Sequence, residues 1–138
     1  MREILFRGKN KVGGDWVEGF FETTHDGAPL IRSRGLHKWV FADTVGQYTG
    51  ETDKNGKKVF EGDILKITRK QGGRTKKVKA LVKYGNLWEK CAFIVAYKGT
   101  AWDYMKDIVD FVDGTKNFEI IGNIHDNPEL LEGGGDHE

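Results

Sequence analysis

The stretch from Gln47 to Phe60, Q-Y-T-G-E-T-D-K-N-G-K-K-V-F, decides how we expect this chain to fold. Its two ends, Gln47–Thr49 and Lys57–Phe60, read as short strands, and Asp53-Lys54-Asn55-Gly56 lies between them. An Asn-Gly pair supplies the two positive φ angles that a type I′ turn requires. The stretch therefore predicts two strands joined by a tight hairpin turn.

The same alternation of short strands and turns continues in both directions. Phe60–Asp63 predicts a second turn, and Gln71-Gly72-Gly73 predicts a reversal between two longer strands. The chain contains 19 glycines and only two prolines, which suits many short strands and tight turns. We expect further strands at Ile4–Arg7, Asp15–Thr23, Lys38–Phe41, Ile64–Thr68, Lys76–Tyr84, Ala92–Tyr97 and Phe118–Ile124.

Two segments carry helical signals instead. In Trp102–Val112 the apolar residues recur at spacings of three and four, which predicts one short amphipathic helix. In Asn127–Leu131 a proline follows Asn127, the order that is typical of the start of a helical turn.

Together these elements predict a mainly β protein, with a β-rich α+β arrangement as the alternative. Residues 37–131 are expected to form a small SH3-like or open barrel, with the one helix near 102–112. Residues 1–36 are expected to form an N-terminal β lobe and loop, and residues 132–138 a flexible acidic tail. A chain of 138 residues can bury a core of this kind without disulfides or metals.

Composition also bears on the compartment. The single Cys91 has no partner for a disulfide and lies in an apolar run, so we expect a buried reduced thiol. No apolar run approaches the roughly 20 residues that cross a bilayer, and the N-terminus does not resemble a signal peptide. These features predict a cytoplasmic protein without contact with a membrane.

Charge is distributed unevenly along the chain. The net charge is +1, but residues 102–138 contain two basic and ten acidic side chains, a balance of 2 − 10 = −8. The stretch from Ile64 to Trp88 contains eight basic residues and no acid. These candidate nucleic-acid or partner residues are Lys66, Arg69, Lys70, Arg74, Lys76, Lys77, Lys79 and Lys83.

Two interpretations of the basic hairpin compete. It could neutralise the phosphates of a nucleic acid, with Tyr84 or Trp88 available for stacking on bases. It could instead lie on the acidic C-terminal segment of the same chain or a neighbouring subunit, or protect a sheet edge. The near-neutral whole-chain charge favours the second interpretation.

The patterns of known catalytic and metal sites are absent. The four histidines and Cys91 show no zinc spacing, and Ser33 is the only serine. Glu51, Asp53 and Asn55 match the first ligands of a calcium loop, but Gly62 stands where that loop needs a glutamate. We therefore expect no metal and no cofactor, and we assign no catalytic residue.

Three parts of the sequence together are similar to the YopX family. The resemblance implies phage or prophage origin, a β-rich architecture and action inside the bacterial cell. It implies no catalytic residues, since the family has no assigned activity. The stretches that carry it are Met1–Lys9 with Trp16–Gly19, Thr44–Gly50 with Asp53–Lys58 and Phe60–Ile64, and Ile120–Leu131.

Three functional hypotheses follow. The first is a non-enzymatic phage accessory protein that acts through protein contacts as a homo-oligomer, to which the opposed charges and the aromatic side chains point. The second is a nucleic-acid-binding small barrel that uses the basic residues 66–83. The third, an enzyme with carboxylate chemistry, has the least support, because no carboxylate pair can be singled out from the sequence.

Overall fold

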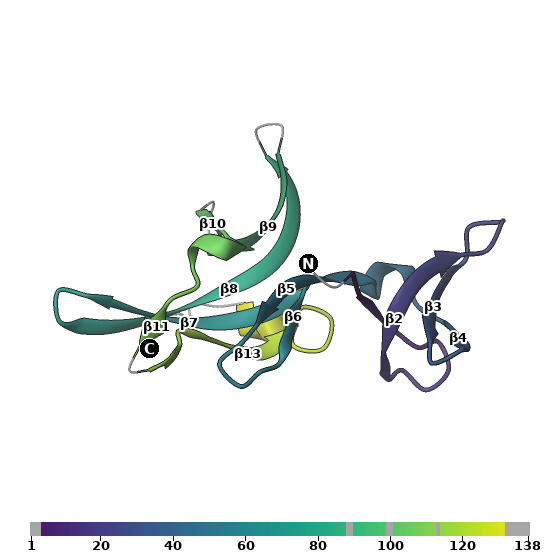
Figure 1. Ribbon diagram of the computed structural model, residues 1–138, viewed down its shortest axis with the longest axis horizontal. Helices are drawn as coiled ribbons and strands as arrows, with labels where there is room; N and C mark the ends of the chain where they lie inside the picture. The colour runs from purple at the N-terminus through teal and green to yellow at the C-terminus, as the bar shows by residue number, and fades with distance from the viewer. Residues whose placement is uncertain (1–3, 88–89, 99–100, 113, 132–138) are drawn as a thin grey trace. The chain divides into compact units, whose positions relative to one another are not determined.

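The computed structural model describes residues 4–87, 90–98, 101–112 and 114–131, and antiparallel β-strands dominate them (Figure 1). The mainly β prediction is confirmed. The chain divides into two compact units, residues 1–50 and residues 51–138. The boundary expected from the sequence, after residue 36, falls at the start of a strand that pairs within the first unit.

Unit 1 is an antiparallel sheet with the strand order β4-β3-β2-β1-β5. Its hydrophobic core is small, and Ile31 and Val40 are fully buried in it. Gly19 lies where β2 meets β3, and a Cβ atom there would come within 2.2 Å of the Arg32 carbonyl oxygen. The elements are β1 (Phe6–Lys9), β2 (Trp16–Thr23), β3 (Pro29–Ser33), β4 (Leu36–Trp39), the 3₁₀ turn η1 (Ala42–Thr44) and β5 (Gly46–Thr52).

Unit 2 contains a five-stranded antiparallel sheet with the order β10-β9-β8-β7-β13 and a small ribbon of β11 and β12. The last two residues of β5 belong to this unit, where β6 is the neighbour of β5 in strand order. The elements are β6 (Lys58–Phe60), β7 (Asp63–Gln71), β8 (Arg74–Leu87), β9 (Lys90–Ala96), β10 (Trp102–Tyr104), the 3₁₀ turn η2 (Met105–Asp107), β11 (Phe111–Val112), β12 (Thr115–Lys116), β13 (Phe118–Asn123) and the 3₁₀ turn η3 (Pro128–Leu131).

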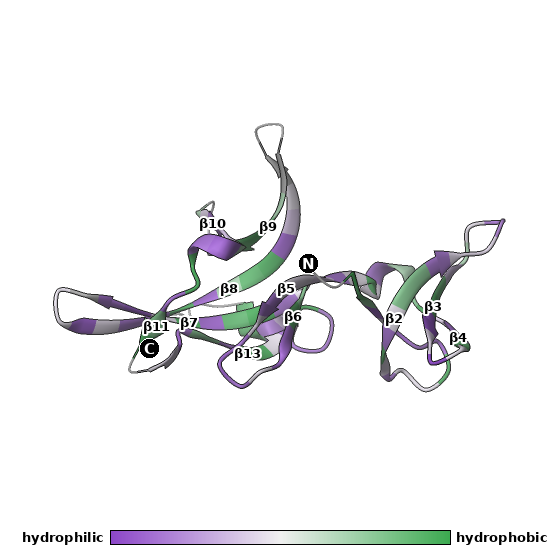
Figure 2. Cartoon of the chain, viewed as in Figure 1, coloured by the Kyte–Doolittle hydropathy of each residue, from purple (hydrophilic) through white to green (hydrophobic). Residues whose placement is uncertain are grey.

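The core of unit 2 lies on one side of the β7–β8 hairpin. Leu65 faces Ala80 and Ile67 faces Val78 across the two strands, and Phe118 of β13 is the partner of Ile67. Because opposite residues in a ladder share a face, these side chains pack together. Figure 2 shows the hydrophobic residues in the middle of β8 and hydrophilic ones along the outer half of the hairpin.

The sheet of unit 2 is open. Strands β10 and β13 are its two ends, and no pairing between them is found among the described residues. The strands that the structure describes therefore do not form a closed barrel. Strand β8 is the longest element and curves from its pairing with β7 into its pairing with β9 (Figure 1).

The turn at Asp53–Gly56 forms where it was predicted, but its type is different. Gly56 has a φ of +81°, whereas Asn55 is not among the residues with positive φ, so the turn is not type I′. Asp53 explains the difference: its Oδ1 accepts hydrogen bonds from the backbone N–H groups of Asn55 and Lys57, both at 2.9 Å. These bonds hold a tight turn that ends in a single left-handed glycine.

The type I′ geometry occurs instead at the end of the β7–β8 hairpin. Gln71 pairs with Arg74, which leaves a two-residue loop of Gly72 and Gly73. Their φ angles are +57° and +81°. Two successive positive φ angles are the requirement of a type I′ turn, and glycine meets it without steric cost.

The helix predicted for residues 102–112 is wrong. Residues 102–104 form β10, paired with β9, and η2 is a single 3₁₀ turn. Met105 and Ile108 are both buried, because residues three apart share a face in a 3₁₀ turn as they do in a helix. Asn117 then ties the backbone into an irregular path by bonding Asp110 N at 3.0 Å and Ile108 O at 2.8 Å.

The helical turn predicted at the C-terminal end is confirmed as η3. Asn127 precedes Pro128, and the N–H of Leu130 bonds the carbonyl oxygen of Asn127 at 3.0 Å. Three predictions fall outside the described residues: those for the Cys91 side chain, for Trp88 and for the tail at 132–138. Within the described residues, no helix has the length and hydrophobicity needed to cross a bilayer.

Candidate anion-binding face

The eight basic residues between Lys66 and Lys83 lie on two different sides of the sheet, because side chains alternate along a strand. In the β7–β8 ladder Lys66 is opposite Lys79 and Thr68 is opposite Lys77, so these four share one side. We call this side of the hairpin the lysine face. It consists of Lys66, Thr68 and Lys70 from β7 and Thr75, Lys77 and Lys79 from β8.

The remaining basic residues of the β7–β8 ladder, Arg69, Arg74 and Lys76, alternate to the core side. Arg74 and Lys76 are exposed there. Arg69 is engaged: its guanidinium is 3.3 Å from the carboxylate of Asp103, and it also contacts the Tyr97 hydroxyl. Arg69 thus forms an ion pair with the acidic segment on the side away from the lysine face.

Tyr97 completes this cluster on the core side. Its hydroxyl donates a hydrogen bond to Asp103 Oδ2 at 2.7 Å, and the Arg69 guanidinium carbon lies 5.0 Å from the centre of its ring. Burial, together with the bond to Asp103, raises the pKa of Tyr97 well above its usual range. The phenol therefore stays protonated, and the cluster is a structural link between β7, the residue that follows β9, and β10.

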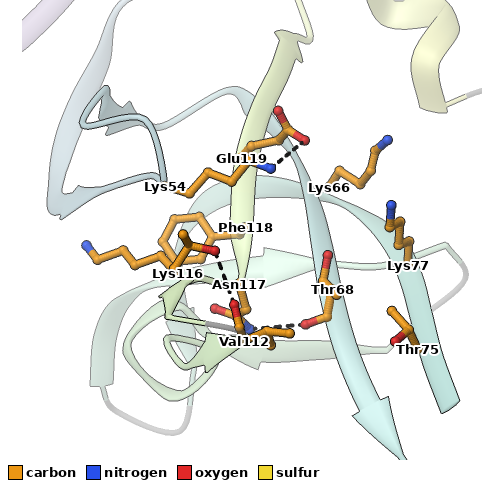
Figure 3. A pocket seen from close by; sticks show the side chains of 11 residues that line it. Lys54, Lys66, Thr68, Thr75, Lys77, Val112, Lys116, Asn117, Phe118 and Glu119 are labelled. Atoms are coloured by element: carbon orange, nitrogen blue, oxygen red, sulfur yellow. Dashed lines mark hydrogen bonds and ion pairs between the residues drawn. The ribbon is translucent and has the colours of Figure 1, made fainter.

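A hollow of about 270 Å³ opens on the lysine face (Figure 3). Its lining is polar and rich in lysine, with hydroxyl groups between the ammonium groups. The β12 and β13 strands form one wall, and the hairpin forms the floor. The lining residues are Lys54, Lys66, Thr68, Thr75, Lys77, Val112, Thr115, Lys116, Asn117, Phe118 and Glu119.

Two of the four lysines at the hollow are already paired. The ammonium group of Lys54 is 3.5 Å from Glu119. Lys116 donates to the carbonyl oxygen of Thr52 at 2.7 Å and lies 3.7 Å from Glu51. These two side chains therefore form the wall of the hollow and contribute little uncompensated charge.

Lys66 and Lys77 are the other two, and neither has a side-chain partner among the described residues. They occupy diagonal positions on neighbouring strands, and Figure 3 shows both side chains extending in the same direction. The hydroxyls of Thr68 and Thr75 likewise have no hydrogen-bond partner in the described part of the chain. Two ammonium groups and two hydroxyls are thus available to an anion.

Other candidate residues are placed less favourably. Lys79 donates to the Leu130 carbonyl oxygen at 3.3 Å, which ties it to η3. Tyr84 alternates to the side of β8 opposite the lysine face and packs edge-on against Phe93, with ring centroids 4.9 Å apart. Tyr84 therefore does not provide a ring for base stacking beside the lysines. The lysine face offers contacts to phosphates instead.

A second hollow, of about 370 Å³, brings three acids together near Arg69 and Lys70. Asp103 is engaged by Tyr97 and Arg69, and Asp110 Oδ1 accepts the N–H of Phe111 at 2.8 Å. Only Asp107 of the three has no partner within the described residues. Those residues also contain no group of three His, Cys, Asp or Glu side chains that could hold a metal ion.

The His125–Asp126 pair belongs to a turn. Asn123 Oδ1 accepts the backbone N–H groups of both residues, at 3.0 Å for His125 and 2.9 Å for Asp126. The Asn123 amide group also donates to Asp126 Oδ2 at 3.1 Å. The side chain of Asn123 thus closes the end of β13.

Sequence reasoning found Lys66 and Lys77 but missed the residues around them. Thr68 and Thr75 could have been found from the two-residue period of the hairpin, which places them beside the lysines. Lys54 and Lys116 come from a turn and a short strand elsewhere in unit 2. Nothing in the local sequence of Lys54 or Lys116 indicates the hollow.

Comparisons with known proteins agree with this architecture. The sequence profile of the YopX protein family matches residues 6–132. The fold is similar to that in the crystal structure of protein EF1440 from Enterococcus faecalis, with a TM-score of 0.55 and 22% identity over 96% of this chain and 100% of that one. Comparison with curated proteins yields no match. The family profile covers nearly the whole chain, and the chain belongs to the YopX family.

Proposed function

We propose that the protein is a non-enzymatic binding protein whose lysine face binds nucleic acid through its phosphates. The observation that carries this proposal is the pair formed by Lys66 and Lys77. Both ammonium groups lack a partner among the described residues, and both point to the same side of a polar hollow (Figure 3). Glu119 also lines the hollow, but its carboxylate is paired with Lys54. The two remaining like charges suit a surface that meets anions.

The expected mode of binding is independent of sequence. Contacts to phosphates position a protein on a nucleic acid, whereas contacts to base edges provide specificity. The lysine face consists of ammonium and hydroxyl groups without an aromatic ring, so it favours contacts to phosphates over contacts to base edges. Binding should weaken with salt, by a slope of about −0.7 to −0.9 in log–log form for each phosphate neutralised.

The hairpin itself provides a matched pair of variants for the test. Lys66→Glu with Lys77→Glu reverses two charges on the lysine face. Arg74→Glu with Lys76→Glu reverses two charges on the other side of the same hairpin, where both side chains are exposed. We expect the first variant to bind a fluorescent oligonucleotide at least about tenfold more weakly at low salt, and the second to lose less than about threefold.

Three readouts decide the outcome. Fluorescence anisotropy with single- and double-stranded DNA and RNA gives the affinity and its salt slope, and circular dichroism confirms that both variants are folded. Equal losses in the two variants would mean that only total charge matters and would contradict the assignment to the lysine face. Failure of the wild-type protein to bind any of these oligonucleotides at low salt would overturn the proposed function.

A second candidate function is self-association through protein contacts. The observation that favours it is the exposure of large apolar side chains in unit 1, where Phe20 is 56% and Trp39 is 47% exposed. Large exposed aromatic residues are enriched at protein interfaces. Light scattering after size exclusion at micromolar concentration tests this function: a defined oligomer supports it, and a monomer contradicts it.

The biological setting is part of the same proposal. We propose that the protein acts in the cytoplasm of a bacterial host as a phage or prophage accessory protein. Membership of the YopX family supports this setting. Fractionation of cells that express the protein at native levels provides the test, and recovery in the membrane or secreted fraction would contradict it.

A further inference from the structure

Four hydrogen-bond donors of the lysine face line one polar hollow, which offers an anion more than general charge attraction. Lys66 and Thr68 come from β7, Thr75 and Lys77 come from β8, and all four share one side of the ladder. None of these side chains has a partner among the described residues. From this arrangement, and resting on the proposed nucleic-acid binding, we infer that the hollow holds a terminal phosphate, a monoester, in preference to a phosphodiester within the strand.

The charge of the hollow fits a dianion. Its lining contributes four lysines and one glutamate. Pairing with Glu119 and Glu51 compensates Lys54 and Lys116, which leaves the two unit charges of Lys66 and Lys77. A phosphate monoester carries about −1.5 to −2 charges near neutral pH, whereas each phosphodiester of a nucleic acid carries one negative charge.

The number of donors points the same way. A monoester presents three strongly accepting terminal oxygens. Thr68 and Lys77 are directly opposite in the ladder, and Lys66 lies diagonal to Lys77. These three side chains supply one donor for each terminal oxygen, whereas a phosphodiester linkage offers only two such oxygens. The Glu119 carboxylate on the rim would repel an anion, but Lys54 lies 3.5 Å from it and offsets that charge.

The size of the hollow also limits what it can enclose. Its volume of about 270 Å³ lies below the roughly 300–1,000 Å³ of pockets that surround whole small-molecule ligands. Phe118 and Val112 line it, but Phe118 is only 1% exposed and offers no open ring for a base. The hollow therefore suits the phosphate group at the end of a chain, with the nucleoside outside.

The experiment compares one oligonucleotide in three forms, labelled internally: with a 5′-phosphate, with a 3′-phosphate, and with hydroxyls at both ends. We expect the wild-type protein to bind at least one phosphorylated form about tenfold more tightly than the hydroxyl form, since hydrogen bonds to charged groups are the stronger kind. Comparing the 5′ and 3′ forms identifies which end is bound.

A variant with unchanged charge separates specific binding in the hollow from general electrostatic attraction. Thr68→Val with Thr75→Val removes both hydroxyls without changing the charge or the size of either side chain. We expect it to lose most of the preference for the terminal phosphate while keeping its affinity for the hydroxyl form. Thr115→Val, whose hydroxyl is committed to the Val112 carbonyl oxygen, is the control and should keep the preference.

The outcomes distinguish this inference from the function on which it rests. Equal affinity of the wild-type protein for all three forms would overturn the terminal-phosphate site and leave nucleic-acid binding intact. A preference that survives in the double threonine variant would also overturn the assignment to this hollow. Absence of binding to every form at low salt would overturn both the proposed function and this inference.

Discussion

The two units of this protein are built from the same kind of strand but are held together differently. Unit 2 has a cluster of ten buried hydrophobic residues centred on the β7–β8 hairpin and Phe118. In unit 1 the buried hydrophobic side chains among the described residues are Ile31, Val40 and Tyr48. Unit 1 therefore relies more on close backbone contacts and surface pairs, and unit 2 on its apolar core.

The largest effect is expected from Phe118→Ala, which breaks the core of unit 2. Phe118 is 1% exposed, and Phe-to-Ala changes at such sites cost about 3–5 kcal/mol. Hydrogen exchange should show faster exchange in β7 and β8, while β2 and β3 keep their protection. Phe111→Ala, at a side chain that is 63% exposed, is the control and should have little effect.

A parallel loss of protection in both units would contradict this expectation. In that case the two units would unfold as one, and the difference in size between their cores would not determine their separate stabilities.

The next effect is expected from Gly19→Ala, which breaks unit 1 at a backbone contact. The new Cβ atom would come within 2.2 Å of the Arg32 carbonyl oxygen, so β2 and β3 must separate. Overpacking of this kind costs about 1–3 kcal/mol, and here the upper end is expected. Gly8→Ala, whose Cβ atom would meet Val40 at 3.1 Å, should cost less.

Thermal unfolding followed by circular dichroism gives the order of these two variants, and hydrogen exchange shows where protection is lost. A larger loss of stability for Gly8→Ala than for Gly19→Ala would mean that the close approach of β2 and β3 at Gly19 does not determine the stability of unit 1.

A polar contact in unit 2 provides a third, smaller test. The Asp53 carboxylate is 2% exposed and accepts N–H groups from Asn55, Lys57 and Ile120. Asp53→Ala leaves these donors without an acceptor and should cost about 1–3 kcal/mol. Asp53→Asn keeps one oxygen and should retain part of that stability in urea unfolding. Equal stability of both variants and the wild type would show that the turn does not depend on the carboxylate.

The smallest effect is expected from an exposed pair in unit 1. The hydrogen bond from Arg32 Nε to Glu22, at 2.7 Å, holds the pKa of the Glu22 carboxyl below its usual value of 4.5. A lowered pKa stabilises the fold above the unfolded-state value, and this contribution is lost as the pH falls through the folded-state value. Glu22→Gln should therefore make the melting temperature of the protein slightly less dependent on pH below about 5.

Glu18→Gln is the control for this pair, because Glu18 lies on the same face of β2 and has no ion pair among the described residues. A pH dependence that is unchanged in Glu22→Gln would show that the pair with Arg32 does not stabilise unit 1.

The sequence was most informative where local chemistry alone determines the structure. Gly72 and Gly73 indicated a reversal, and the apolar alternation around Ile67 indicated a strand; both are confirmed. It failed for residues 102–112, because a 3₁₀ turn produces the same spacing of buried Met105 and Ile108 as a helix. The hydrogen bond from the Asn117 side chain to the Ile108 carbonyl oxygen favours the 3₁₀ turn over the helix. Asn117 lies outside the segment, and the sequence does not show which backbone groups its side chain bonds.

Only part of the candidate site could likewise be predicted from the sequence. A count of charges finds all eight basic residues, but only the register of Lys66 with Lys79 separates the lysine face from Arg74 and Lys76. The walls formed by Lys54 and Lys116 depend on contacts between separate turns and strands. Long-range contacts of that kind leave no local pattern to read.

The two-glycine turn at the end of the β7–β8 hairpin also limits how the length of this hairpin can change. Strand faces alternate with every residue, so inserting one residue into each strand would move every side chain beyond the insertion to the opposite side. Lys77 and Thr75 would then change places with Arg74 and Lys76. Two residues per strand would restore the pattern. Natural variants of this hairpin that keep the lysine face are therefore expected to differ by even steps in each strand.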